Sequence, residues 1–137
     1  MNQLYRTILS GLLLLGAATA SAGTVEVRVA GVTAKGTVKV AVCDKERFLK
    51  QCAYSASAPA QAGETTVSVK GVPAGTWAVL AYQDENGNGE LDRNFIGMPK
   101  EPYGFSRDAR GKFGPPTFED AAIEVGEAQA TANVRVR

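Results

Sequence analysis

Valine alternates with polar residues along much of the chain, and this alternation predicts β-strands. The segments TVEVRVA and GTVKVAVC place their valines two residues apart, so every second side chain falls on one face. ETTVSVK, DAAIEV and QATANVRVR show the same period with fewer apolar positions. TWAVLAYQ is apolar almost without interruption, which is typical of a central strand covered on both faces.

Turn-forming residues separate these segments and help to predict the fold class. Gly31, Gly36, the run from Pro73 to Gly75, and Gly126 each stand between two apolar segments. Six or seven short strands without a helical stripe favour an all-β fold. We expect an antiparallel β-sandwich of immunoglobulin-like or transthyretin-like kind, with about seven strands and one long ordered loop. A small barrel is the alternative.

Two segments lack the alternation. Residues 44–63 carry a run of small residues and are interpreted as a surface excursion. Residues 84–120 contain no alternating stretch and are longer than most loops in compact proteins, which indicates a loop that is functional or specially stabilised.

The first 22 residues have the three parts of a secretory signal. Arg6 ends a short basic region, residues 8–18 are largely apolar, and Ala20 and Ala22 are the small residues that a signal peptidase requires. The apolar stretch is far shorter than the roughly 20 residues that span a bilayer. We therefore expect cleavage after Ala22, a single domain over residues 23–137 with no membrane span, and a periplasmic or secreted protein.

Export makes the two cysteines interpretable. Cys43 and Cys52 both follow the predicted signal, and thiols pair in an oxidising compartment. A disulfide between them would close a short loop and stabilise the fold by roughly 2 to 3 kcal/mol. Two free thiols are the alternative.

Composition narrows the chemistry. The chain has no histidine, which excludes a Ser/His/Asp or Cys/His triad and the usual histidine-bearing zinc sites. Of the 15 basic and 14 acidic residues, only Arg6 precedes Gly23, so 14 of each sign remain after cleavage. A neutral chain with scattered charges does not indicate nucleic acid or anionic lipid as a partner.

The segment DENGNGELD fits the pattern D-x-N-x-N-G-x-x-D, the first three-quarters of a calcium loop. Position 12 of such a loop is Phe95 instead of the usual glutamate, so any affinity should be weak, about 10⁻⁴ to 10⁻³ M. The alternative is a metal-free turn in which the Asn-Gly pairs supply positive φ. The candidate ligands are Asp84, Asn86, Asn88, the Glu90 carbonyl and Asp92, completed by Glu101 or water.

Aromatic residues and prolines crowd the rest of the long loop. These rings need a contact, so they either cap the end of the sandwich or line a groove for a peptide or glycan. The candidate binding residues are Tyr103, Phe105 and Phe113. Lys100, Glu101, Tyr103 and Asp108 have side chains capable of acid/base work, but their spacing does not fix a mutual geometry.

Two long strings in this region support a family resemblance. DENGNGELDxNFIGMPKEPYGFS, followed by FGPPxFEDA, resembles an exported bacterial family catalogued as domain of unknown function 2141. The upstream turn and strand GVPAGTWAV is similar to the same family, which usually has Tyr where this chain has Trp77. The resemblance implies an export signal and a β-sandwich, and it implies no activity.

The sequence thus favours an exported non-enzymatic β-sandwich module of uncharacterised role, with a protein or glycan as partner and calcium as its only candidate cofactor. The long aromatic loop serves binding or structure in this hypothesis. Two alternatives stay open. One is a small hydrolase that uses loop carboxylates and Tyr103, and the other is a purely structural envelope protein.

Overall fold

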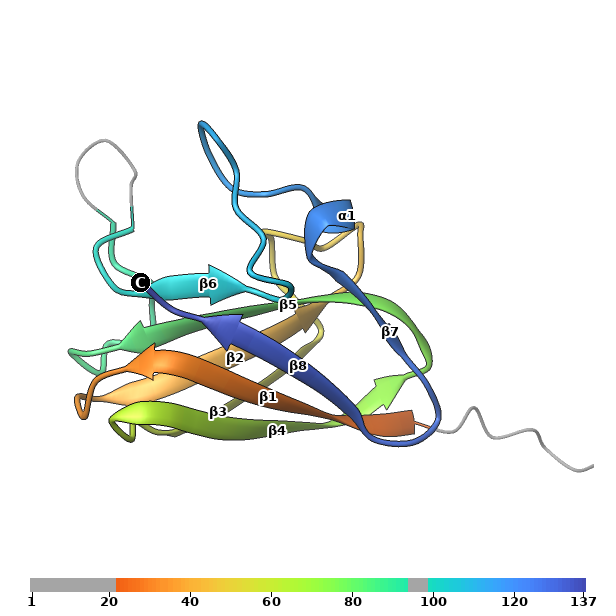
Figure 1. Ribbon diagram of the computed structural model, residues 1–137, viewed down its shortest axis with the longest axis horizontal. Helices are drawn as coiled ribbons and strands as arrows, with labels where there is room; N and C mark the ends of the chain where they lie inside the picture. The colour runs from red at the N-terminus through yellow and green to blue at the C-terminus, as the bar shows by residue number, and fades with distance from the viewer. Residues whose placement is uncertain (1–21, 94–98) are drawn as a thin grey trace, which may run out of the picture.

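The computed structural model describes residues 22–93 and 99–137 (Figure 1). The predicted signal peptide, apart from Ala22, and Phe95 lie outside the described residues. In the described part of the chain, no helix has the length and apolar character needed to cross a membrane.

Within the described residues, eight strands form two sheets, which confirms the all-β sandwich. The first sheet has the order β4-β1-β8, and the second has the order β3-β2-β5-β6, with β7 pairing another stretch of β5. β1 and β8 are parallel, whereas the other strand pairs are antiparallel, so the sandwich is not purely antiparallel. The elements are β1 (Ala22–Val32), β2 (Thr37–Cys43), β3 (Tyr54–Pro59), β4 (Gly63–Pro73), β5 (Gly75–Asp84), β6 (Tyr103–Phe105), α1 (Phe118–Ala121), β7 (Ala122–Val125) and β8 (Ala130–Arg135).

The alternating valines form the core between the two sheets. Because successive side chains of a strand point to opposite faces, each valine-rich strand buries one face and leaves the other outside. Buried valines come from both sheets, including Val25, Val27 and Val29 of β1 and Val38, Val40 and Val42 of β2.

β5 is covered on both faces, as its apolar run predicts. Val79 and Ala81 belong to the core between the sheets. Ala78 and Leu80 lie on the opposite face of β5 and pack in a second cluster. The long segment after β5 and the turn after β2 supply the rest of this cluster, with Phe48, Tyr103, Phe105, Ala109, Phe118 and Ala121. The long segment therefore covers the outer face of the second sheet.

Both segments without alternation contain regular structure, so the predicted surface excursion and the predicted long loop each include elements that the sequence did not predict. β3 arises within residues 44–63, where Tyr54, Ala56 and Ala58 pack against the core and the intervening serines face outward. Small alanines carry too weak a hydrophobic signal to stand out from a polar run. In residues 84–120, β6 is only three residues long, and Thr117 caps α1 by accepting the Asp120 N–H at 3.3 Å.

Cys43 and Cys52 form a disulfide, as predicted. Their Cα atoms are 4.8 Å apart, which is an ordinary separation for a bridged pair. The bridge joins the end of β2 to the segment that leads into β3. It therefore holds the turn that carries Phe48 close to the sheet that this ring covers.

The two sheets approach each other along one edge, where β6 meets the end of the chain. Tyr103 and Arg137 exchange two backbone hydrogen bonds, both of 3.2 Å. A Cβ atom at Gly104 would lie 2.1 Å from the Arg135 carbonyl oxygen, so only glycine permits this approach. The contact places the turn after β6 beside β8.

Candidate functional site

Asp84 ends the central strand β5 and organises the loop that follows it. Its side chain is almost completely buried, with 1% of the residue exposed. Its Oδ1 atom accepts the Gly87 N–H at 3.0 Å, and its Oδ2 atom accepts the Gly89 N–H at 2.7 Å. Gly87 and Gly89 have φ values of 72° and 79°, the left-handed conformation that the Asn-Gly pairs favour. The loop is therefore wrapped around the carboxylate of Asp84.

Glu101 closes the loop from its other end. It is 8% exposed, and its Oε2 atom accepts the Glu85 N–H at 2.7 Å. Its Oε1 atom accepts the Asp92 N–H at 3.0 Å. No Lys or Arg among the described residues forms an ion pair with Glu101 or Asp84. Two buried carboxylates thus rely on backbone N–H groups for their partners.

Asn86 and Asn88 converge on Asp92. The Nδ2 atoms of both amides donate to the Asp92 carboxylate, one to each oxygen. The Oδ1 atom of Asn86 accepts the Asn88 N–H at 3.2 Å, and that of Asn88 accepts the Glu90 N–H at 2.9 Å. The amide N–H groups therefore stand where a cation would meet the carboxylate.

Tyr82 contacts this loop, and the pKa of its phenol is affected by the charges there. Its hydroxyl donates to the Gly89 carbonyl oxygen at 3.1 Å. Burial raises the pKa of the phenol, and the negative charges of four carboxylates raise this pKa further. Those carboxylates are Asp84, Glu101, Glu90 and Asp92. The electrostatic potential around Tyr82 is therefore negative.

The predicted calcium ligands gather in one loop, and Glu101 joins them. Within residues 22–93 and 99–137, however, no three Asp, Glu, Cys or His side chains are grouped closely enough to hold a metal. The observed loop is a turn whose buried polar groups are satisfied internally, and none of the described buried side-chain polar atoms lacks a partner. Cation binding requires the Asn86 and Asn88 amides to rotate and present oxygen.

The aromatic candidates divide between the interior and the surface. Phe105 is 6% exposed and packs edge-on against Phe48, with ring centroids 6.0 Å apart. Tyr103 is half-buried beside it, at 6.1 Å between centroids. Phe113 is fully exposed. The rings of Phe105 and Tyr103 therefore cap the sheet, and Phe113 alone of the three has its whole side chain exposed to solvent.

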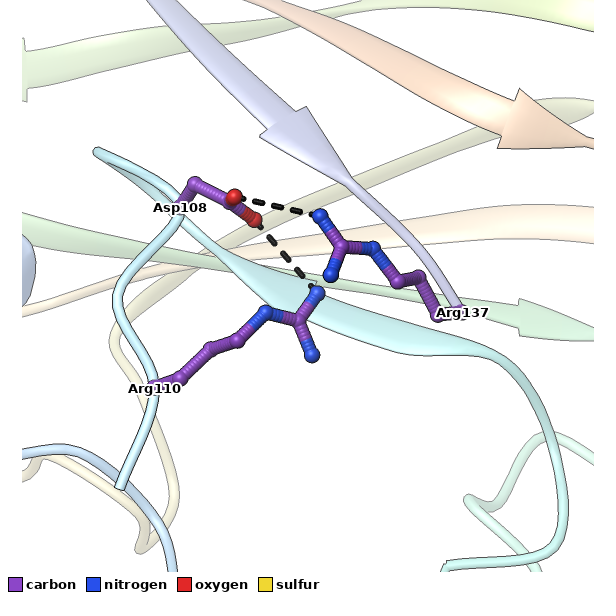
Figure 2. A network of polar contacts seen from close by, with 3 residues as sticks. All are labelled: Asp108, Arg110 and Arg137. Carbon is purple, nitrogen blue, oxygen red and sulfur yellow. Dashed lines mark hydrogen bonds and ion pairs between the residues drawn. The ribbon is translucent and has the colours of Figure 1, made fainter. Parts of the chain in front are cut away.

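The residues considered for acid/base work do not form one constellation. Glu101 accepts hydrogen bonds from the backbone of the loop from Asp84 to Asp92, called the acidic loop below. Asp108 instead accepts hydrogen bonds from Arg110 at 3.4 Å and Arg137 at 3.2 Å (Figure 2). Among the described residues, no hydrogen bond joins any two of Lys100, Glu101, Tyr103 and Asp108.

The two arginines in Figure 2, Arg110 and Arg137, are residues that the sequence patterns did not single out. Arg137 lies just beyond β8, whereas Arg110 and Asp108 lie in the loop after β6. The only signal in the sequence was the high share of arginine near the carboxyl end, because it is the fold that brings these residues together from separate segments.

Comparison with known proteins places most of the chain in one family. The family model described as "Uncharacterized protein conserved in bacteria (DUF2141)" matches residues 27–133. No curated protein and no solved structure matches the chain.

Proposed function

The chain belongs to the DUF2141 family of bacterial proteins, and because this membership brings no activity with it, we propose a function from the acidic loop and its neighbours. We propose that the protein is an exported, non-enzymatic β-sandwich module whose loop from Asp84 to Asp92 binds Ca²⁺ weakly. The ion orders this end of the sandwich. The adjoining aromatic segment, with Phe113 at its surface, contacts a protein or glycan partner.

The burial of Asp84 and Glu101 carries this proposal. Removing a carboxylate from water is costly unless hydrogen bonds or a cation compensate its charge. Backbone N–H groups supply only partial positive charge at both residues. A divalent cation would complete the compensation for two carboxylates that contact the same loop, Asp84 at its start and Glu101 from beyond its end.

The residues present suit Ca²⁺ better than softer metals. Ca²⁺ takes six to eight oxygen ligands in a flexible geometry, and carboxylates, amides and carbonyls are its usual ligands. Asp84, Asp92 and Glu101 would supply carboxylates after the loop draws together around the ion, and Asn86 and Asn88 would supply amide oxygens after rotation. The rotation breaks the amide hydrogen bonds to Asp92, which is a reason to expect weak affinity. We expect a dissociation constant of about 10⁻⁴ to 10⁻³ M.

Thermal unfolding with and without calcium tests the cation site. The purified protein is unfolded in excess chelator and then in about 10 mM CaCl₂, where the proposed affinity predicts a stabilisation of about 1.4 to 2.7 kcal/mol. The midpoint should rise by several degrees. Asp84→Asn with Asp92→Asn should abolish the rise, whereas Glu46→Gln with Glu127→Gln, which removes two exposed carboxylates elsewhere, should retain it.

A rise that persists in the loop variant, or no rise at all, would make the segment a metal-free turn. MgCl₂ at the same concentration is the matched ion, and its smaller size and stricter octahedral geometry predict a lesser shift.

The structural envelope protein is the second candidate, and the burial of Phe105 favours it. The two functions differ in what Phe113 does, because only the binding function depends on its exposed ring. Capture of a partner from the native envelope should weaken in Phe113→Ala if this surface binds. Unchanged capture by Phe113→Ala favours the structural function.

A further inference from the structure

A hollow of about 410 Å³ lies on the outer face of the first sheet, beside the turn after β6. This volume is within the range of small-molecule sites. The polar and charged residues that line it are Arg28, Glu64, Arg107, Asp108, Asn133 and Arg135. They come from β1, β4, β8 and the turn after β6, so the folded chain assembles the hollow from four distant segments.

One wall of the hollow is a tight turn of unusual composition. The Ala109 N–H donates to the Ser106 carbonyl oxygen at 3.3 Å, which closes the turn. Its two central residues, Arg107 and Asp108, have φ values of 60° and 51°. Positive φ at both central positions normally selects Asn, Asp or Gly, and an arginine there costs conformational energy. Strained residues of this kind cluster at binding sites, where the position of the side chain offsets the cost.

The guanidinium groups of the hollow are only partly compensated. Arg107 donates to the Glu119 backbone carbonyl at 3.3 Å, a contact that leaves its charge in place. The Arg135 side chain forms no hydrogen bond or ion pair with any residue in the described ranges. Arg28 shares its Nε–H with Glu26 at 3.1 Å and keeps its terminal N–H groups.

The carboxylates near the hollow are too few to neutralise the arginines. Asp108 is already shared by Arg110 of the same loop and Arg137 from just beyond β8 (Figure 2). Three arginines, at 28, 107 and 135, and two carboxylates, at 64 and 108, line the hollow, and one of these carboxylates, Asp108, is paired with arginines from outside the lining. The hollow therefore carries excess positive charge although the chain as a whole is close to neutral.

We infer that this hollow binds an anion that bears phosphate groups. The arginine fork matches both carboxylate and phosphate, but a carboxylate has only two oxygens. Three guanidinium groups around one hollow are better matched to the three or more oxygens of a phosphate, and Asn133 adds an amide donor. The site lies on a different face from the acidic loop, and it stands whether or not that loop binds calcium.

Titration with inorganic pyrophosphate, monitored by calorimetry, tests this site. The titration is done at low ionic strength and again at physiological ionic strength. Binding should weaken about 10-fold or more in Arg135→Gln and in Arg107→Gln, because each loses a charged hydrogen-bond donor. Arg47→Gln removes the same charge from an exposed turn outside the hollow and should leave binding unchanged. Raising the salt should weaken binding, since exposed charges are screened.

A second arm separates a soluble ligand from a lipid headgroup. Vesicles of phosphatidylglycerol and of phosphatidylcholine are sedimented with each variant. Pyrophosphate binding that is lost in the hollow variants assigns a soluble phosphate ligand, and binding to phosphatidylglycerol alone, lost in the same variants, assigns a headgroup. The inference is overturned if neither probe binds, or if Arg47→Gln weakens binding as much as Arg135→Gln does. Circular dichroism melting of each variant excludes unfolding as the cause.

Discussion

Ser106 and Val79 exchange two hydrogen bonds in the interior of the protein. The Ser106 N–H donates to the Val79 carbonyl oxygen at 2.8 Å, and the Val79 N–H donates to Ser106 Oγ at 3.0 Å. The same hydroxyl donates to the Ala121 carbonyl oxygen. Because β6 ends at Phe105 and β7 begins at Ala122, Ser106 fills the gap between the two strands that pair with β5.

Ser106→Ala should therefore destabilise the fold without changing its shape. The substitution leaves the buried Val79 N–H and Ala121 carbonyl without this partner, and each unsatisfied group costs about 1 to 3 kcal/mol. Urea unfolding followed by circular dichroism measures the loss. Ser68→Ala, at an exposed position of β4, is the matched control and should change little.

The disulfide should contribute measurably to stability. Cys43 and Cys52 are nine positions apart, and the chain-entropy model gives about 2.5 kcal/mol for a loop of this size. Urea unfolding of Cys43→Ala with Cys52→Ala should show this loss. Adding a reductant should destabilise the native protein and leave the double variant unchanged, whereas equal effects on both would indicate that the bridge does not contribute.

Alanine substitution should lower the stability of the fold at Phe105 and hardly change it at Phe113. Phe105→Ala removes a buried ring from the cluster with Phe48 and should cost about 3 to 5 kcal/mol. Phe113→Ala removes a fully exposed ring and should change stability by less than about 0.5 kcal/mol. Thermal or urea unfolding separates the two. Similar losses in both variants would show that Phe113 is packed in solution.

The raised pKa of Tyr82 leads us to expect that the free energy of unfolding declines at alkaline pH. Its pKa is raised in the folded protein, chiefly by burial and then by nearby carboxylates, whereas the unfolded phenol ionises near the ordinary value of about 10. The stabilising contribution is therefore complete below the unfolded pKa and is lost as the pH rises through the folded pKa. Tyr82→Phe should remove this part of the pH dependence.

Calcium should change the same titration if the proposed site exists. A bound cation would offset the carboxylates near Tyr82 and lower the pKa of its phenol, whereas the effect of burial on this pKa would remain. Phenolate absorbance of the native protein minus that of Tyr82→Phe isolates this group. A difference titration that is the same in calcium and in chelator would argue against the site.

Arg107→Gly should separate stability from binding at the hollow. Glycine adopts positive φ without the steric cost that arginine bears, so the free energy of unfolding should rise by about 0.5 to 1 kcal/mol. Binding of pyrophosphate should fall, because the guanidinium is gone. A variant that is less stable than the native protein would indicate that the Arg107 contact with Glu119 outweighs the strain.

The sequence predicted those parts of the fold that rest on local patterns. Valine alternation located the core-forming faces, and the uninterrupted run from Trp77 to Tyr82 identified the central strand. β3 was missed because alanine and serine alternate with little contrast, and β6 because three residues are too few to show a period.

The candidate sites differ in how much the sequence could show. The spacing from Asp84 to Asp92 is local, so the acidic loop was recognisable, but its hydrogen bonds to Glu101 depend on a return of the chain. The arginine hollow combines residues from β1, β8 and the turn after β6. The net charge of the chain is close to zero, so the excess positive charge arises only where the fold brings these arginines together.

The parallel pairing of β1 with β8 has a mechanical consequence. Six residue pairs join the two strands, from Val25 with Ala130 to Ala30 with Arg135. The amino end of β1 and the carboxyl end of β8 lie at opposite ends of this ladder (Figure 1). A pull on the two ends therefore acts along the strands and loads all the ladder bonds in shear together, whereas an antiparallel pair would open one bond at a time. Tethered at both ends, the sandwich would transmit tension through this one ladder, and its lifetime under load would be set by the rate at which the ladder breaks.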